Sequence, residues 1–202
     1  MKNRPMHLGA GRLKHPKGSV TGEHVVIGPE WFYRIANYDR IKPFLMSLAS
    51  ASNHWMFISS EGGLTAGRQS PDSALFPYYT EDKVHDGSDH TGSRTLLRVE
   101  KDDRWFLWEP FSRRCKAMYA VTRSLAKNVD GNKLIFEEVN DDLELIFRFS
   151  WVSSRTFGFV KHSELVNTSG ASVTLEVLDG VENILPWGVE HLFQNQYSSL
   201  VD

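Results

Sequence analysis

Cationic, acidic and aromatic side chains gather in one stretch of the chain, residues 53–81. The stretch opens with an apolar run at 55–58, typical of a strand, and breaks at the turn signal 59–63. About fifteen residues then fit neither the helical nor the strand period, and long irregular loops in compact domains are often functional. Guanidinium and carboxylate groups hydrogen-bond sugar hydroxyls, while aromatic rings cover the C–H faces of sugars. The candidate sugar contacts are Arg68, Asp72, Tyr78, Tyr79 and Trp55. The alternative is an ordinary connection whose aromatic residues cover the end of a sheet.

A second mixed segment, residues 104–111, combines acid, base and aromatic side chains. As a strand it sends alternate side chains to opposite faces, one facing the core and the other free to line a groove. Trp108 and Glu109 are the candidate ligand contacts there.

No group of residues has the spacing of a catalytic or metal site. Glycoside chemistry needs paired carboxylates, but none of Glu61, Asp72, Glu109, Asp179 and Glu182 stands out by spacing. The segment 85–90 holds four potential metal ligands, yet it matches no common zinc or calcium pattern and is interpreted as a solvated loop. We therefore predict no catalytic residue, no metal and no cofactor. Cys115 is the single cysteine, so no internal disulfide forms, and we expect an inert thiol.

Composition indicates an ordinary globular protein. The 202 residues are 41% hydrophobic and 24% charged, with a net charge of −2, which argues against a nucleic-acid partner. No apolar run approaches the length of a membrane span, and the basic N-terminus lacks the apolar core of a secretory signal, so we expect a cytoplasmic protein.

The order of predicted elements favours an all-β fold. Strands are expected at 31–37, 43–48, 55–58, 94–99, 104–108, 116–127, 134–139, 143–151, 155–166 and 172–178. A four-residue polar loop, 100–103, joins two of them, and the last five strands form an antiparallel meander, as in a sandwich or barrel. Residues 1–22 are interpreted as a flexible basic arm, 23–186 as the β domain and 187–202 as a helix. That helix carries an apolar stripe (Val189, Leu192, Phe193, Gln196, Leu200) and is expected to begin a linker to a further domain.

Four phrases carry a family resemblance: HWMFISSEGGLTAGRQSPDSALFPYYTEDKV (54–84), LWEPF (107–111), IFEEVNDDLELIFRFSW (135–151) and LDGVENILPWGV (178–189). Over residues 31–202 the chain resembles the N-terminal part of large bacterial proteins related to cellobiose and cellodextrin phosphorylases, a glycoside-hydrolase-like family. The resemblance implies an antiparallel β-supersandwich of the galactose-mutarotase-like kind, followed by a helical linker and an (α/α)6 barrel. In the family the barrel carries the catalytic acid and binds phosphate, while the sandwich helps to close the sugar site and contributes to dimerisation. No catalytic residue of the barrel has a counterpart here.

Three functions stay open. The first is a non-catalytic domain that binds an oligosaccharide or shapes its site in a larger glycoside phosphorylase- or hydrolase-like enzyme. The second is a structural or dimerisation module without a ligand of its own. The third is a mutarotase-like enzyme, which needs a carboxylate and one of His54, His162 or His191 to converge in a cleft.

Overall fold

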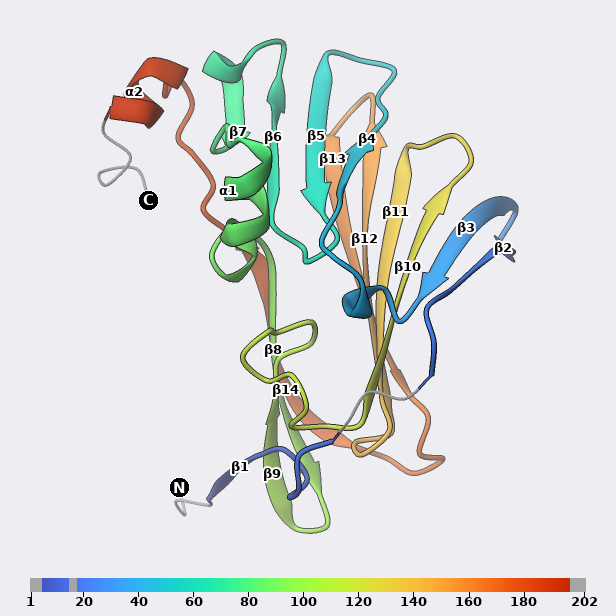
Figure 1. Ribbon diagram of the computed structural model, residues 1–202. Coiled ribbons are helices and arrows are strands. Elements are labelled where there is room, and N and C mark those ends of the chain that lie inside the picture. Colours follow the sequence, from blue (N-terminus) through green and yellow to red (C-terminus); the bar gives the residue numbers. More distant parts are fainter. Residues whose placement is uncertain (1–4, 15–17, 197–202) are drawn as a thin grey trace.

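The computed structural model describes residues 5–14 and 18–196 and consists mostly of strands, with 50% strand and 11% helix in three mostly antiparallel sheets. Figure 1 shows a broad sheet that fans out on one side and two smaller sheets on the other side. The expectation of a mostly β, mostly antiparallel protein is confirmed.

The large sheet contains six strands in the order β13 (Gly158–Asn167), β12 (Leu145–Ser154), β11 (Lys133–Asn140), β10 (Val121–Asn128), β3 (Glu30–Ala36) and β2 (Thr21–Ile27). All neighbours are antiparallel. Its first four strands are successive in the chain, so the predicted meander is confirmed from β10 to β13. The strand predicted at 116–127 begins later, at Val121.

The other two sheets have four strands each. The β8–β9 sheet has the order β1 (Met6–Leu8), β9 (Arg104–Trp108), β8 (Gly92–Lys101) and β14 (Thr174–Glu182), and β1 runs parallel to β9. The β5–β6 sheet has the order β4 (Leu45–Leu48), β5 (His54–Ser59), β6 (Leu64–Arg68) and β7 (Ala74–Phe76). The short helices are α1 (Glu81–Asp86) and α2 (His191–Gln196), with 3-10 turns η1 (Tyr38–Arg40), η2 (Pro71–Ser73) and η3 (Gly87–Asp89).

Several predicted elements were wrong in detail. The fifth meander strand, β14, leaves the large sheet and pairs with β8. The irregular stretch after the turn at 59–63 contains β6, η2 and β7, and the predicted loop at 85–92 contains the end of α1, η3 and the start of β8. The hairpin loop at 100–103 shrinks to Asp102 and Asp103, because both take positive φ and close a two-residue turn.

Both ends of the described chain contain short elements. Within the expected arm, β1 pairs with β9, and β2 begins at Thr21. The predicted C-terminal helix begins at His191. Residues 1–4, 15–17 and 197–202, including Leu200, lie outside the described residues.

One apolar core joins the three sheets. In β12 buried and half-buried side chains alternate from Leu145 to Trp151, which confirms the predicted period of two. These side chains pack with residues of the two smaller sheets, among them Met56, Ile58, Leu64, Phe76, Leu97, Val99 and Trp108. Phe76 and Trp151 meet edge to face across this core, with ring centroids 6.3 Å apart.

A buried carboxylate links the large sheet to the β8–β9 sheet. Glu138 in β11 is 1% exposed. It accepts hydrogen bonds from Trp108 Nε1 (2.8 Å), the backbone N–H of Phe111 (2.7 Å) and Arg123 Nε (2.7 Å). Arg123 is buried as well, so this ion pair lies in the interior, where its members need every one of these partners.

We expect Glu138→Ala to lower the free energy of unfolding by about 3–5 kcal/mol, because it leaves the Arg123 charge buried without compensation. Urea unfolding measures this change. The matched control is Glu176→Ala, which removes the exposed partner of Arg98 and should cost about 1 kcal/mol or less. Equal losses of unfolding free energy in the two variants would show that the buried Glu138 contributes no more to stability than an exposed ion pair.

Candidate functional site

The β5–β6 sheet separates the predicted sugar contacts onto two faces. Arg68 lies opposite His54, and Gly67 lies opposite Trp55. Directly opposite residues share a face and successive residues alternate, so Arg68 and Trp55 are on opposite sides of the sheet. The His54 ring contacts Phe159 of the large sheet, with centroids 5.4 Å apart, so Arg68 belongs to the inner face and Trp55 to the outer face.

On the outer face, the predicted contacts hold helix α2. The ring of Tyr78 lies edge-on to both Trp55 (5.6 Å) and His191 (5.1 Å). The backbone N–H of Tyr78 donates to Gln194 Oε1 (3.0 Å), and the Asp72 carboxylate accepts from the backbone N–H of His191 (2.9 Å). These groups therefore have a docking role, as in the alternative of aromatic residues that cover the end of a sheet.

Tyr79 is half-buried beside α1. Its backbone N–H donates to Thr65 Oγ1 (3.4 Å), and the Lys83 ammonium lies 5.9 Å from its ring centroid. Like Tyr78, it contacts a neighbouring helix.

Trp108 is a core residue and does not line a groove. It is 1% exposed, and its indole N–H is donated to Glu138. The face of β9 that carries Trp108 is therefore covered by the large sheet.

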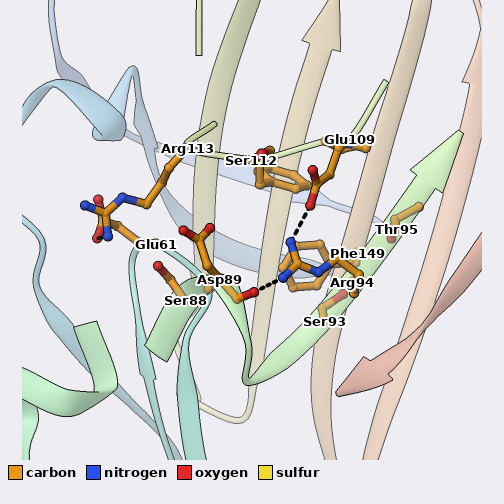
Figure 2. Close-up of a pocket in the computed structure, with 13 residues that line it drawn as sticks. Glu61, Ser88, Asp89, Ser93, Arg94, Thr95, Glu109, Ser112, Arg113 and Phe149 are labelled. Atoms are coloured by element: carbon orange, nitrogen blue, oxygen red, sulfur yellow. Dashed lines mark hydrogen bonds and ion pairs between the residues drawn. The ribbon is translucent and has the colours of Figure 1, made fainter. Parts of the chain in front are cut away.

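Glu109 belongs to a compact ionic cluster built around Arg94 (Figure 2). The Arg94 guanidinium donates to Glu109, to Glu182 (3.1 Å) and to the backbone carbonyl of Asp89. The hollow beside it has a volume of only about 30 Å³, room for water but not for a sugar. We interpret the cluster as structural.

A larger hollow lies on the inner side of the β5–β6 sheet, at the β12–β13 turn. We call it the end hollow. Its volume is about 430 Å³, and its lining comes from His54, 67–68, 73–75, 155–159, Leu185 and Trp187. It therefore joins segments of three regions that are far apart in the chain, and Arg68 is the one predicted contact that lines it.

Two glycines in the lining of the end hollow allow close packing of neighbouring segments. Gly158 closes the β12–β13 turn with φ of +75°, and a Cβ there would lie 2.9 Å from Nε2 of His54. A Cβ on Gly67 would lie 2.7 Å from Cα of Ala74 and 2.6 Å from the ring of Trp55. Side chains at either position would push these segments apart.

The end hollow is cationic and aromatic. Arg68 and Arg155 are both exposed, and neither guanidinium has a hydrogen-bond or ion-pair partner among residues 5–14 and 18–196. No carboxylate is part of the described lining. Trp187 and Phe157 are 81% and 78% exposed, so their rings are available to a ligand. Burial, and then the nearby Arg68 charge, lower the pKa of His54.

Sequence reasoning missed Arg155, Phe157 and Trp187. The predicted strand at 155–166 placed the first two inside regular structure, whereas β12 ends at Ser154 and β13 begins at Gly158. The signal was Gly158 itself, because a glycine after polar residues often marks a turn. Trp187 was assigned to a helix that begins only at His191.

The three histidines considered for mutarotase-like chemistry lie apart. His54 lines the end hollow, where no described carboxylate joins it, and His191 lies edge-on to Tyr78. His162 shares a hollow on the opposite face of the large sheet with Glu137 and Glu164, but both carboxylates are paired with Arg148. Burial raises the pKa of the Cys115 thiol, which suits an inert cysteine.

No group of three or more His, Cys, Asp or Glu side chains within the described residues is arranged to hold a metal ion. No helix in this part of the chain is long and apolar enough to cross a membrane.

We expect the pKa of His54 to lie below its usual 6.5 and to rise in Arg68→Ala, while staying below 6.5 because the burial remains. An NMR pH titration of the imidazole measures it. Arg98→Ala, remote in the β8–β9 sheet, is the control and should leave this pKa unchanged. The absence of any rise in Arg68→Ala would show that the Arg68 charge does not act on His54.

Comparison of the chain with protein-family models and with curated proteins finds no match.

Proposed function

We propose that the chain is a non-catalytic carbohydrate-binding or site-shaping β-sandwich domain of a larger, cytoplasmic glycoside phosphorylase- or hydrolase-like enzyme. The observation that carries this proposal is the end hollow, which Arg68 and Arg155 line together with exposed Trp187 and Phe157, and where neither guanidinium has a partner among the described residues. The galactose-mutarotase-like supersandwich is part of the proposal. It is supported by the family resemblance and is compatible with the three antiparallel sheets.

The chemistry of the end hollow suits a sugar. Each guanidinium offers five N–H donors in a planar fork, and sugar hydroxyls accept such bonds. Aromatic rings supply flat apolar faces, and ligand sites combine such faces with a few convergent polar groups. Arg68 keeps its role from the sequence, whereas Arg155, Trp187 and Phe157 replace Asp72, Tyr78 and Tyr79.

The chain segment that supplies Leu185 and Trp187 to the end hollow has features that favour contact with a further domain. From β14 onward several apolar side chains are exposed, among them Val177, Leu178, Ile184, Leu192 and Phe193. Exposed apolar groups gathered in one stretch are typical of contact surfaces. In this proposal an (α/α)6 barrel of the same protein covers them and completes the sugar site.

The same exposed residues favour a second candidate, a structural or dimerisation module without a ligand. In that case Trp187 and Arg155 are anchors of an interface, since Trp and Arg are enriched at such contacts. A homodimer in solution without sugar affinity would support this candidate.

We expect isothermal titration of the chain with β-linked and α-linked gluco-oligosaccharides to give saturable binding. Arg68→Ala and Arg155→Ala should each weaken it about tenfold or more, because each removes hydrogen bonds from a charged donor. Arg98→Ala, whose side chain pairs with Glu176 outside the hollow, is the matched control and should keep the affinity within about twofold.

Light scattering on the same samples separates the two candidates. A monomer that binds sugar and loses the binding in both arginine variants supports the carbohydrate-binding domain. Dimers that bind none of the sugars contradict it and support the interaction module.

A further inference from the structure

We propose that the end hollow selects sugars that carry an anionic group, a carboxylate or a phosphate, over neutral sugars, with Arg68 and Arg155 as the anion-binding pair. This inference rests on the proposed function and adds the class of ligand.

The lining of the end hollow is positively charged. The two guanidiniums come from different parts of the chain, the end of β6 and the β12–β13 turn, and line one hollow without a described carboxylate. The whole chain has a net charge of −2, so a lining with two cations and no acid departs from the average surface. A hollow with charge of one sign attracts a ligand of the opposite sign.

Many arginines of the fold have a carboxylate partner, whereas Arg68 and Arg155 do not have one among the described residues. Carboxylate partners are present for Arg34, Arg94, Arg98, Arg113, Arg114, Arg123 and Arg148. Exposed Arg113 and Arg114 are among these paired residues. Arg12, Arg40 and Arg104 lack a carboxylate partner among the described residues, but none of them lines the end hollow. Arg68 and Arg155 have none among the described residues although they share one hollow. A ligand oxyanion would supply the missing partner, since guanidinium forks match carboxylate and phosphate in paired hydrogen bonds.

The environment of His54 also suits an anionic ligand in the end hollow. The lowered pKa leaves this imidazole neutral near pH 7, so it adds a polar wall without a further positive charge. Burial, and then the Arg68 charge, lower this pKa, and the Phe159 ring lies edge-on to the imidazole. Its Nδ1 already shares a hydrogen bond with Ser52 Oγ (2.6 Å), which holds the ring in place. An anion bound at Arg68 would offset the positive charge and raise the pKa of His54.

The aromatic rings indicate that the anion belongs to a larger molecule. Trp187 and Phe157 are among the most exposed apolar side chains of the described chain, and both line the hollow beside the arginines. A free inorganic ion would leave these rings uncovered. A sugar acid or a sugar phosphate would place its charge on the arginines and its C–H face on a ring.

The test is titration of the chain with glucuronate, glucose 6-phosphate, glucose and inorganic phosphate at matched ionic strength. We expect the two charged sugars to bind at least about tenfold more tightly than glucose or inorganic phosphate. Their affinity should fall about tenfold when salt rises from about 50 to about 500 mM, since screening weakens exposed ionic contacts.

Variants assign the effect to the arginines. Arg68→Gln combined with Arg155→Gln removes both charges while keeping long polar side chains, and it should abolish the preference for charged sugars. Arg98→Gln is the matched control and should leave it intact. The pKa of His54, followed by NMR, should rise when glucuronate binds and stay constant with glucose.

The outcomes separate this inference from the proposed function. Equal affinity for glucose and glucuronate, unchanged by salt, would overturn the anion preference and leave the sugar-binding domain standing. Inorganic phosphate that binds as tightly as the charged sugars would overturn the inference of a sugar ligand and leave a simple anion site. Failure of all four ligands and of neutral oligosaccharides to bind would overturn both proposals.

Discussion

The joint between the large sheet and the β8–β9 sheet depends on the buried carboxylate of Glu138. Its two oxygens accept bonds from Trp108, Phe111 and Arg123, so one side chain of β11 holds the end of β9, the chain that follows it and β10. Each of these buried polar groups would be destabilising without its partners, so their contributions to stability depend on one another. A second tie crosses between the same sheets, where Asp179 of β14 accepts from Lys161 of β13 (2.6 Å) and Thr95 of β8 (2.6 Å).

The positions of these ties differ between the two smaller sheets. The contacts of Glu138 and Asp179 join the large sheet to the β8–β9 sheet, and the Arg94 cluster fills the space beside Glu109. Between the large sheet and the β5–β6 sheet the contacts include the aromatic pairs Phe76–Trp151 and His54–Phe159. Beyond the second pair, at the β12–β13 turn, lies the end hollow with Arg68 and Arg155. Among the described residues, Glu138, Asp179 and Arg94 have partners of opposite charge, whereas Arg68 and Arg155 have none.

Local patterns in the sequence predicted the strands better than their partners. The alternation in β12 and the turn signals between β10 and β13 depend on neighbours in the chain, and both predictions were confirmed. The pairing of β14 with β8 is a long-range contact that no local pattern indicates. Glu138 alternates with Leu134 and Phe136 on the buried face of β11, yet its partner Trp108 lies 30 residues away in the chain.

The residues of the candidate site likewise depend partly on local sequence and partly on long-range contacts. Arg68 was predicted as a sugar contact from its residue type, and it stays a prediction. The two faces of the β5–β6 sheet separate it from Trp55, while Arg155 and Trp187 of later segments line the same hollow.

The central claim is that sugar binds in the end hollow and not on the outer face of the β5–β6 sheet. Two-dimensional NMR spectra of the tryptophan indole N–H groups, recorded while glucuronate is added, test this claim most directly. Trp187 borders the hollow, whereas Trp55 lies on the outer face against Tyr78. The account predicts a saturable shift of the Trp187 signal while the Trp55 signal stays in place. A saturable shift of Trp55 with Trp187 unchanged would place the ligand on the outer face and contradict the account.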